Sequence, residues 1–482
     1  MCRREDFKPL GTAATLDSAA KEEALFRQRH SELAEKLMPK WREVIKAIPG
    51  GKMKIATLFS GRLDGFATVG ERFLAATELL ARADSDPLVQ SHWEKRRKGG
   101  KLQSWGDIEN VIGSTHLQVV LLAIHALIVS PPCKDWSMAG MLLRSKSRSG
   151  CWLLDWTRVL KMGRPPLLLM EFIYSEEDPA FQEALKELKA KLEVEYDYIV
   201  AEPSECVVNA AEVGGEDRVR LILPARAVEV HGTNPVGIAR LPAGVTHTQA
   251  VMADWLVPAA ARGSIQKYSG PVRWLQSEQA LQSRKSARGS FQVTLGAVRQ
   301  GGLGHRVMSP YHAWPTIRAT TLDNRYRQPM GPTEGFQEPV TGKIVLPERE
   351  EIMRIRGYPA QVATTNGKAW SWQTTASFAG RGVGAEHAVV GIVSLVRLLQ
   401  GCNLKKGPTE HQQGQADTAP PRRRVVRMRG VTATNGQRSR SLEPGYSSGG
   451  SADRRRQFGP TCPWTAGTMC RESSCRKRIG RH

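Results

Sequence analysis

Residues 125–141 read HALIVSPPCKDWSMAGM, and the rest of the chain can be understood outward from this stretch. The apolar run 126–129 has the length of a short buried strand and stops at Ser130-Pro131-Pro132. Proline cannot continue the ladder of a central strand, so the chain must leave the sheet where Cys133 follows. Ligands of open α/β sheets bind at the carboxyl ends of strands. The pattern predicts a nucleophile at such an end, although a lone cysteine beside an apolar run is more often an inert buried thiol.

Length and composition indicate a globular protein of two or three domains. The chain has 482 residues, of which 40% are hydrophobic, so it can bury a large core. It contains no run of about 18 apolar residues, and its first residues, MCRREDFKPL, lack the apolar stretch of a secretion signal. We therefore expect no membrane association. Eight scattered cysteines do not form a disulfide framework, which favours a reducing compartment and a free Cys133.

The charge of the chain predicts a polyanionic partner. The formal net charge is +22 at pH 7, and nucleic acid is the first candidate because neutralising phosphates releases counterions. Residues 404–482 contribute 17 Lys and Arg against 5 Asp and Glu. This Gly, Ser and Arg-rich tail has too little apolar material to offset its ordering entropy, so we expect it to be disordered.

Several segments alternate between strand and helix patterns, which is typical of α/β architecture. The β-prone run 55–59 precedes a glycine-bearing turn at 61–65 and a helical pattern from Phe66, an arrangement in which backbone N–H groups can approach a cofactor. Asp84 follows another candidate strand, 79–83, where such folds hold ribose hydroxyls. A further acid, Asp107, lies in Trp105-Gly106-Asp107-Ile108. Each acid taken alone is more often a turn residue.

The second half of this region contains an unusual buried acid. The segment PPLLLMEFI is an apolar strand whose only charge is Glu171, and a carboxylate in such surroundings needs a partner or a task. An amphipathic helix over 176–193 and a strand over 198–201 are expected next. Arg218 and Arg220 should then project from one face of an extended segment, because strand side chains alternate.

Two further segments, 19–48 and 142–150, lie outside the strand and helix alternation. The charged helical stretch 19–48 ends at Pro49-Gly50-Gly51, and we expect a solvated helical appendage that packs loosely on the next domain. The basic loop 142–150, LLRSKSRSG, is either a solvated surface or a loop that closes over a phosphate backbone.

In their order along the chain, these residues resemble the motifs of the cytosine-5 DNA methyltransferase family over roughly residues 54–399. The resemblance implies an S-adenosylmethionine-dependent methyltransferase fold, which is Rossmann-like α/β, with a smaller inserted target-recognition domain. Phe59-Ser60-Gly61 resembles the family's Phe-x-Gly turn, Pro131-Pro132-Cys133 resembles its Pro-Cys motif, and Glu171 resembles the acid of its Glu-Asn-Val motif. Arg218-Val219-Arg220 resembles the end of its Gln-x-Arg-x-Arg motif. Residues 352–359 (IMRIRGYP) resemble its Arg-Leu-Gln-Gly-Phe-Pro signature, and residues 380–383 resemble its Gly-Asn-x-Val motif.

The family resemblance also implies the roles of these residues. Cys133 would add to C6 of a flipped cytosine, Glu171 would stabilise the ring at N3, Arg220 would hold O2 and Arg218 would order the site. The implied methyl donor is S-adenosylmethionine, with Asp84 at its ribose and Asp107 at its adenine. The residues expected to line the donor site are Phe59, Ser60, Gly61, Asp84, Asp107, Ile108, Pro131 and Val383. We expect no metal, duplex DNA as the partner, a monomer, and a location in the nucleus of a eukaryote or in the cytoplasm and nucleoid of a bacterium.

The expected domains are a helical appendage (1–52), the catalytic core (53–225), a target-recognition region (226–343), a return to the core (344–403) and the tail (404–482). The recognition region carries scattered basic residues suited to phosphate contacts, and a solvated basic surface is its alternative reading.

Some positions differ from the family pattern. The cofactor turn, GRLDG, has one residue more than the family's turn, and Lys134, Phe172, Glu216 and Arg381 replace the family's polar amide residues. Cys133 and Glu171, the groups that make and break bonds, are retained. An RNA-directed relative and a catalytically degenerate DNA-binding copy remain alternatives. The length of the recognition region and the absence of a Cys-Phe-Thr motif favour DNA.

Overall fold

The computed structural model describes residues 19–96, 102–132, 135–136, 143–232, 234–247, 348–365, 367–400 and 402, with four short strands between residues 292 and 345. All of them belong to the first of two units, residues 1–417. The tail therefore lies outside the described residues, as do Cys133 and most of the loop that follows it.

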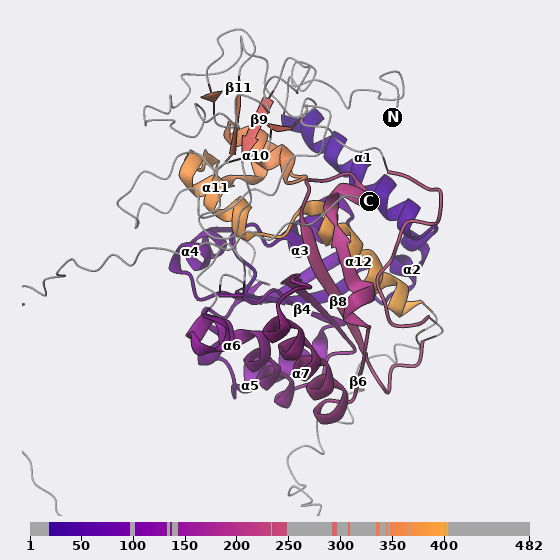
Figure 1. Cartoon of the computed structure of the whole chain (residues 1–482). Coiled ribbons are helices and arrows are strands. Elements are labelled where there is room, and N and C mark those ends of the chain that lie inside the picture. Colours follow the sequence, from indigo (N-terminus) through magenta and orange to yellow (C-terminus); the bar gives the residue numbers. More distant parts are fainter. Residues whose placement is uncertain are drawn as a thin grey trace, which may run out of the picture. The chain divides into compact units, whose positions relative to one another are not determined.

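An eight-stranded mixed sheet forms the centre of the described chain (Figure 1). Its order is β3-β2-β1-β4-β5-β8-β6, with β7 paired to β8. Strands β1 to β5 run parallel, whereas β8 is antiparallel to β5, β6 and β7. The strands are β1 (Met53–Leu58), β2 (Thr77–Ala83), β3 (Gln103–Ser104), β4 (Ala126–Val129), β5 (Leu167–Ile173), β6 (Tyr198–Val200), β7 (Val207–Asn209) and β8 (Val219–Ala227). This mixed α/β sheet agrees with the expected Rossmann-like methyltransferase class.

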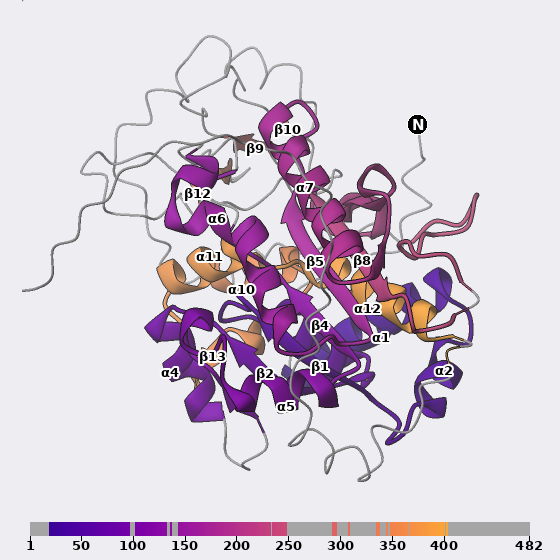
Figure 2. The ribbon, with the colours of Figure 1, turned by 90° about the horizontal axis from the view of Figure 1, so that it is seen from below.

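The central strands are apolar because both faces of the sheet are covered. Every residue of β4 and β5 is buried, including Glu171, as expected for parallel strands between two helical layers. Figures 1 and 2 show α5, α6 and α7 on the side of the sheet away from α1 and α2. The helices are α1 (Ala19–Leu37), α2 (Trp41–Ala47), α3 (Gly65–Ala67), which continues as a π-helix (Thr68–Phe73), α4 (Pro87–Arg96), α5 (Thr115–Ala123), α6 (Arg148–Asp155), α7 (Pro179–Glu195), α10 (Arg349–Ile355), α11 (Trp372–Arg381) and α12 (Ala385–Leu399), besides short 3₁₀ turns.

Helix α12 is the core helix of the second layer. All its residues except Arg397 are buried, and it packs against β5, β8 and α1. Among the described residues, the stretch Thr374–Leu399, which ends with α12, is long and apolar enough to cross a membrane by composition. Its apolar window is 89% buried, as in a core helix, which passes the same test. Gly391 allows the close approach of α12 to the sheet, since a Cβ there would lie 2.8 Å from Leu169 and 2.7 Å from Phe66.

The N-terminal helix belongs to this core, which corrects the expectation of a loosely packed appendage. Phe26 and Leu33 of α1 are fully buried, and α1 packs against α12. Two buried polar contacts tie it to α10 and to the turn after that helix: Glu22 accepts a hydrogen bond from Arg354 Nε at 2.7 Å, and His30 Nε2 donates to the Gly357 carbonyl at 2.8 Å. The expected single helical stretch is divided at residues 38–40 into α1 and α2.

Burial of His30 makes stability depend on pH. Burial lowers the pKa of His30 from 6.5 to about 3, so the folded protein keeps this ring neutral while the unfolded chain protonates it below pH 6.5. The free energy of unfolding should therefore fall with decreasing pH between about 6.5 and 3, with up to ~1.4 kcal/mol per pH unit due to this histidine. In thermal unfolding from pH 7 to 5, His30→Gln should show a shallower fall. His116→Gln, at an exposed position of α5, should keep the wild-type slope.

The core also extends past its expected boundary at residue 225. Strand β8 ends at Ala227, and Ile238 and Ala239 are buried in the core. The Ala239 N–H donates to Ser394 Oγ of α12 at 2.8 Å. Between residues 292 and 345, in the recognition region and at the start of the expected return to the core, the structure describes a four-stranded antiparallel sheet of order β10-β9-β11-β12. Its strands are β9 (Gln292–Leu295), β10 (Val307–Met308), β11 (Glu334–Gln337) and β12 (Ile344–Val345). The basic residues predicted to contact phosphates there lie outside the described residues. A hairpin of β13 (Thr364–Thr365) and β14 (Lys368–Ala369) precedes α11.

Candidate active site

The carboxyl ends of β2, β1 and β4 lie level with one another and with Met170 of β5, a strand that continues to Ile173. The aligned residues are Ala83 of β2, Leu58 of β1, Val129 of β4 and Met170 of β5, and the residues that follow them are Asp84, Phe59, Ser130 and Glu171. Three of these four followers are predicted site residues. The fourth, Ser130, begins the Ser-Pro-Pro segment that leads to Cys133. The sheet register therefore brings the predicted donor turn, the ribose acid and the catalytic acid to one edge.

The Phe59–Gly61 turn is held against the end of β2. Phe59 and Gly61 have positive φ angles of 57° and 64°, and the Gly61 N–H donates to Asp84 Oδ2 at 2.7 Å. Burial raises the pKa of Asp84, a sign that its charge is partly desolvated. A Cβ at Gly61 would meet nothing within 4 Å, so there is open space beside the turn. The Phe59 ring lies 5.2 Å from that of Trp152 of α6.

Arg82, which was not among the predicted site residues, holds this turn by hydrogen bonds to Ser60 and Gly61. Its side chain is almost fully buried, and Nη2 donates to Ser60 Oγ at 2.6 Å and to the Gly61 carbonyl at 3.1 Å. The guanidinium lies 4.2 Å from the centre of the Trp93 ring, a cation–π arrangement. Buried Asp64 caps α3 and accepts from Thr57 Oγ1 at 2.8 Å. The one sequence signal for this role is that Arg82 is a charged residue inside an otherwise apolar candidate strand, 79–83.

The turn that carries Asp107 and Ile108 lies beside Asp84. The Asp84 N–H donates to the Gly106 carbonyl at 2.8 Å. Asp107 caps a short 3₁₀ turn by accepting from the Glu109 N–H at 3.1 Å, and Ile108 is buried. The turn interpretation of Asp107 therefore holds, and its predicted contact with adenine stays a prediction.

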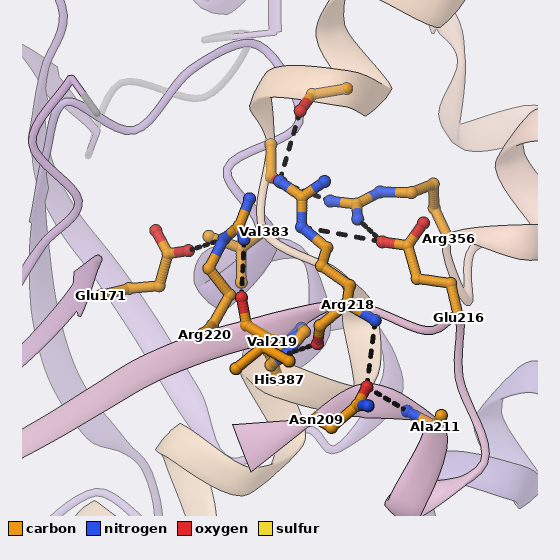
Figure 3. Close-up of polar contacts among 12 residues, drawn as sticks. Glu171, Asn209, Ala211, Glu216, Arg218, Val219, Arg220, Arg356, Val383 and His387 are labelled. Atoms are coloured by element: carbon orange, nitrogen blue, oxygen red, sulfur yellow. Dashed lines mark hydrogen bonds and ion pairs between the residues drawn. The ribbon is translucent and has the colours of Figure 1, made fainter. Parts of the chain in front are cut away.

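Glu171 and Arg220 form an ion pair across β5 and β8. Arg220 pairs with Ile173 in the antiparallel register, so Glu171, two residues away, lies on the same face. Arg220 Nε lies 3.0 Å from Glu171 Oε1, and both side chains are almost buried, with 13% and 11% of their surface exposed (Figure 3). Arg220 Nη1 also donates to the Val219 carbonyl at 2.7 Å, which fixes the guanidinium. The two residues predicted to hold neighbouring polar atoms of a cytosine, N3 and O2, are thus in contact.

Arg218 contacts the turn that contains Val383. Its Nη2 donates to the carbonyls of Gly380 at 3.2 Å and Gly382 at 3.3 Å. Val383 is buried, and its carbonyl accepts from Tyr358 Oη at 2.8 Å. Arg218 directly precedes β8 and Arg220 is its second residue, and their side chains contact different neighbours: the 380–383 turn for Arg218 and Glu171 for Arg220 (Figure 3).

Cys133 lies outside the described residues, so its predicted place beside Glu171 stays a prediction. Its described neighbours are well anchored: Pro131 is buried, and so is Asp135, which accepts from Ser147 Oγ at 2.6 Å and from Ser149 Oγ. Trp136 Nε1 donates to the Gly150 carbonyl at 2.9 Å. The side chains of Ser147 and Ser149 therefore hold the basic segment at 143–150 against the residues that follow Cys133.

Two described cysteines, Cys206 and Cys402, have a raised pKa and are unsuited to nucleophilic attack. Burial raises the pKa of Cys206 to about 12 and also raises that of Cys402, so both thiols stay protonated at neutral pH. Among the residues that the structure describes, no cluster of three or more His, Cys, Asp or Glu is placed to hold a metal ion.

Comparison with protein-family models matches residues 53–362 to the C-5 cytosine-specific DNA methylase model. The match spans more than half of the chain. The chain belongs to this family. No curated protein matches it significantly.

Solved structures with a similar fold include other methyltransferases. The Entamoeba histolytica methyltransferase EhMeth is 15% identical, with a TM-score of 0.48 and coverage of 72% of this chain and 98% of that one. The S. pombe Dnmt2 methyltransferase is also 15% identical, with a TM-score of 0.42 and the same coverage. A putative DNA modification methyltransferase encoded within an E. coli prophage has 15% identity, a TM-score of 0.45 and coverage of 72% and 99%.

The geometry at Asp84 leads to a binding prediction for this methylase. Asp84→Ala removes both the proposed ribose acceptor and the acceptor of the Gly61 N–H. A hydrogen bond to a charged group contributes ~1.5–3 kcal/mol, so we expect the Kd for S-adenosylmethionine to rise about tenfold or more. Titration calorimetry would measure the change. Asp84→Asn, which keeps one acceptor oxygen, should lose less affinity. Equal affinity in wild type and Asp84→Ala would exclude Asp84 from the donor site.

Proposed function

We propose that this family member is an S-adenosylmethionine-dependent DNA (cytosine-5-)-methyltransferase that acts through a covalent adduct at Cys133. The observation that carries the proposal is the Glu171–Arg220 ion pair. In the sheet register, Glu171 is level with Ser130, where the segment that leads to Cys133 begins. A buried carboxylate paired with a fixed arginine suits recognition of the polar edge of a pyrimidine. The family match supports cytosine C5 as the reacting atom.

The proposed roles follow from the chemistry of cytosine. C5 is a poor nucleophile, and addition of the Cys133 thiolate to C6 turns the ring into an enamine with its electron density at C5. Negative charge builds at N3 as the S–C6 bond forms, and the Glu171 carboxyl would stabilise it by sharing a proton. Arg220 would fix the Glu171 carboxylate through Nε while holding the cytosine O2. After transfer, loss of the C5 proton would break the S–C6 bond and restore both the aromatic ring and the thiolate.

The residues at the strand edge fit the implied methyl donor. Bound S-adenosylmethionine would supply an electrophilic methyl group on its sulfonium sulfur. The Phe59–Gly61 turn has open space beside Gly61, and Asp84 holds that turn in place while keeping lone pairs for the ribose hydroxyls. Ile108 and Val383, both buried, would form the apolar walls of the site.

Duplex DNA is the proposed substrate, and tRNA is the alternative. The net charge of +22 suits either polyanion. The region between residues 247 and 348, about a hundred residues with a sheet of its own, supports DNA, because a target-recognition domain must read bases in the major groove. A target cytosine would have to leave the stack to reach Glu171.

Incubation with a radiolabelled methyl donor tests the substrate. Labelled 5-methylcytosine should appear in duplex DNA and not in tRNA. Label in tRNA alone would overturn the proposal in favour of the RNA-directed alternative. Tight DNA binding without transfer to either substrate would identify a degenerate DNA-binding copy. Bisulfite sequencing of a methylated plasmid would then give the target sequence.

A further inference from the structure

Two positions where the chain departs from the family's motifs meet in the structure. Glu216 stands where the motif before the arginine pair has glutamine, and Arg356 stands at the glutamine of the Arg-Leu-Gln-Gly-Phe-Pro signature. They are 140 residues apart, yet Arg356 Nη1 forms an ion pair with Glu216 Oε1. Their side chains are 0% and 2% exposed, so the pair is fully enclosed. Two positions that are neutral amides in the family's motifs thus carry opposite charges in this chain.

This pair is connected to the residues of the candidate site. Arg218 Nε lies 3.7 Å from Glu216 Oε1, so the carboxylate lies between two guanidinium groups (Figure 3). Arg356 Nη2 donates to the Gly382 carbonyl, which also accepts from Arg218. The two arginines therefore hold the backbone immediately before Val383 from two directions, and Glu216 holds the two arginines together.

The surrounding charges make each partner dependent on the other. Arg356 is fully buried, and burial lowers its pKa; Glu386, also buried, has its pKa raised by burial. The Glu386 carboxylate lies close to Gly357, where a Cβ would lie 2.6 Å from Oε2. A second acid beside Arg356 does not replace Glu216, because it does not contact Arg218 or the Gly382 turn in any described hydrogen bond. Removing one member of a buried pair leaves an uncompensated charge, whereas removing both can be nearly neutral.

We propose that Glu216 and Arg356 are a charge-exchanged positioning pair, which replaces two neutral side chains and holds Arg218 and the 380–383 turn in place for binding of the methyl donor. This inference rests on the proposed function of the site. Neither residue needs to touch a substrate. Their effect is transmitted through the Gly382 carbonyl to Val383 and through the adjacent Arg218.

A double-mutant cycle tests the pair with Glu216→Gln, Arg356→Gln and the double variant, which restores the family's two glutamines. Each single change should lower the Tm without donor by about 5 °C or more. Each should also raise the Kd for S-adenosylmethionine about tenfold in titration calorimetry, equivalent to ~1.4 kcal/mol. The double variant should recover most of both losses, since its two neutral amides can hydrogen-bond to each other.

Glu22→Gln is the matched control. It breaks another buried Glu–Arg pair, with Arg354, that holds α1 and does not reach the 380–383 turn. It should lower the Tm but leave the Kd unchanged. Two results would overturn the positioning role: additive losses in the double variant, or single variants that have a reduced Tm but bind the donor with wild-type affinity. In either case, binding of the donor by the wild type would still support the proposed function. Failure of the wild type to bind the donor would overturn both proposals.

Discussion

Replacing Cys133 with alanine is expected to abolish methyl transfer, with a loss of at least about 10³-fold in kcat/KM, because the proposed mechanism takes the nucleophile that activates C5 from the Cys133 thiol. Single-turnover transfer of labelled methyl to duplex DNA would measure the loss. Binding of DNA and of the methyl donor should persist in the variant, since neither depends on the thiol.

Cys402→Ala is the matched control for this substitution. Its thiol donates to the Leu398 carbonyl at the end of α12, and its raised pKa keeps it protonated. We expect its activity to stay near that of the wild type. Transfer by Cys133→Ala at more than a small fraction of the wild-type rate would contradict a covalent mechanism at that residue.

Replacing Glu171 with glutamine should have the second largest effect, lowering kcat by about 10²–10⁴-fold, the range of an acid–base contribution. The amide keeps the shape of the side chain but cannot share a proton with N3, and it leaves Arg220 without its ion pair. Rapid-quench measurement of the transfer step would report the change, and thermal unfolding would separate it from lost stability.

Arg220→Lys tests the same pair from the other side. Lysine keeps the charge but not the fixed planar geometry, so we expect a smaller loss than for Glu171→Gln. A wild-type kcat in Glu171→Gln would show that the ion pair has only a structural role.

Local sequence patterns predicted the strands well because the central sheet is buried on both faces. The apolar run 126–129 is strand β4 at the same residues, and the segment around Glu171 is β5. The helix expected over 176–193 is α7 (Pro179–Glu195), and the strand expected over 198–201 is β6 (Tyr198–Val200). Such elements are specified by their own residues, since burial requires continuous apolar runs and the prolines and caps mark their ends.

Long-range contacts account for what the sequence could not show. Helix α1 has charged residues on much of its surface, which suggested a solvated appendage, but Glu22 and His30 are buried against residues more than 300 positions later. The Glu216–Arg356 pair likewise appears only when the chain is folded. Its one sequence signal is that two motif positions changed from neutral to opposite charges, and that signal does not say that the two side chains meet.

The central claim is that the Cys133 sulfur and the Glu171 carboxyl act on one extruded cytosine. Its most direct test uses a DNA duplex with 5-fluorocytosine at the target, where fluorine replaces the proton that must leave C5, so the S–C6 bond cannot break after transfer. Peptide mass mapping should then locate a stable, methylated nucleotide adduct on Cys133, and Glu171→Gln should reduce its rate of formation. An adduct on another residue, or 5-methylcytosine production from ordinary duplex with no trapped adduct, would contradict the account.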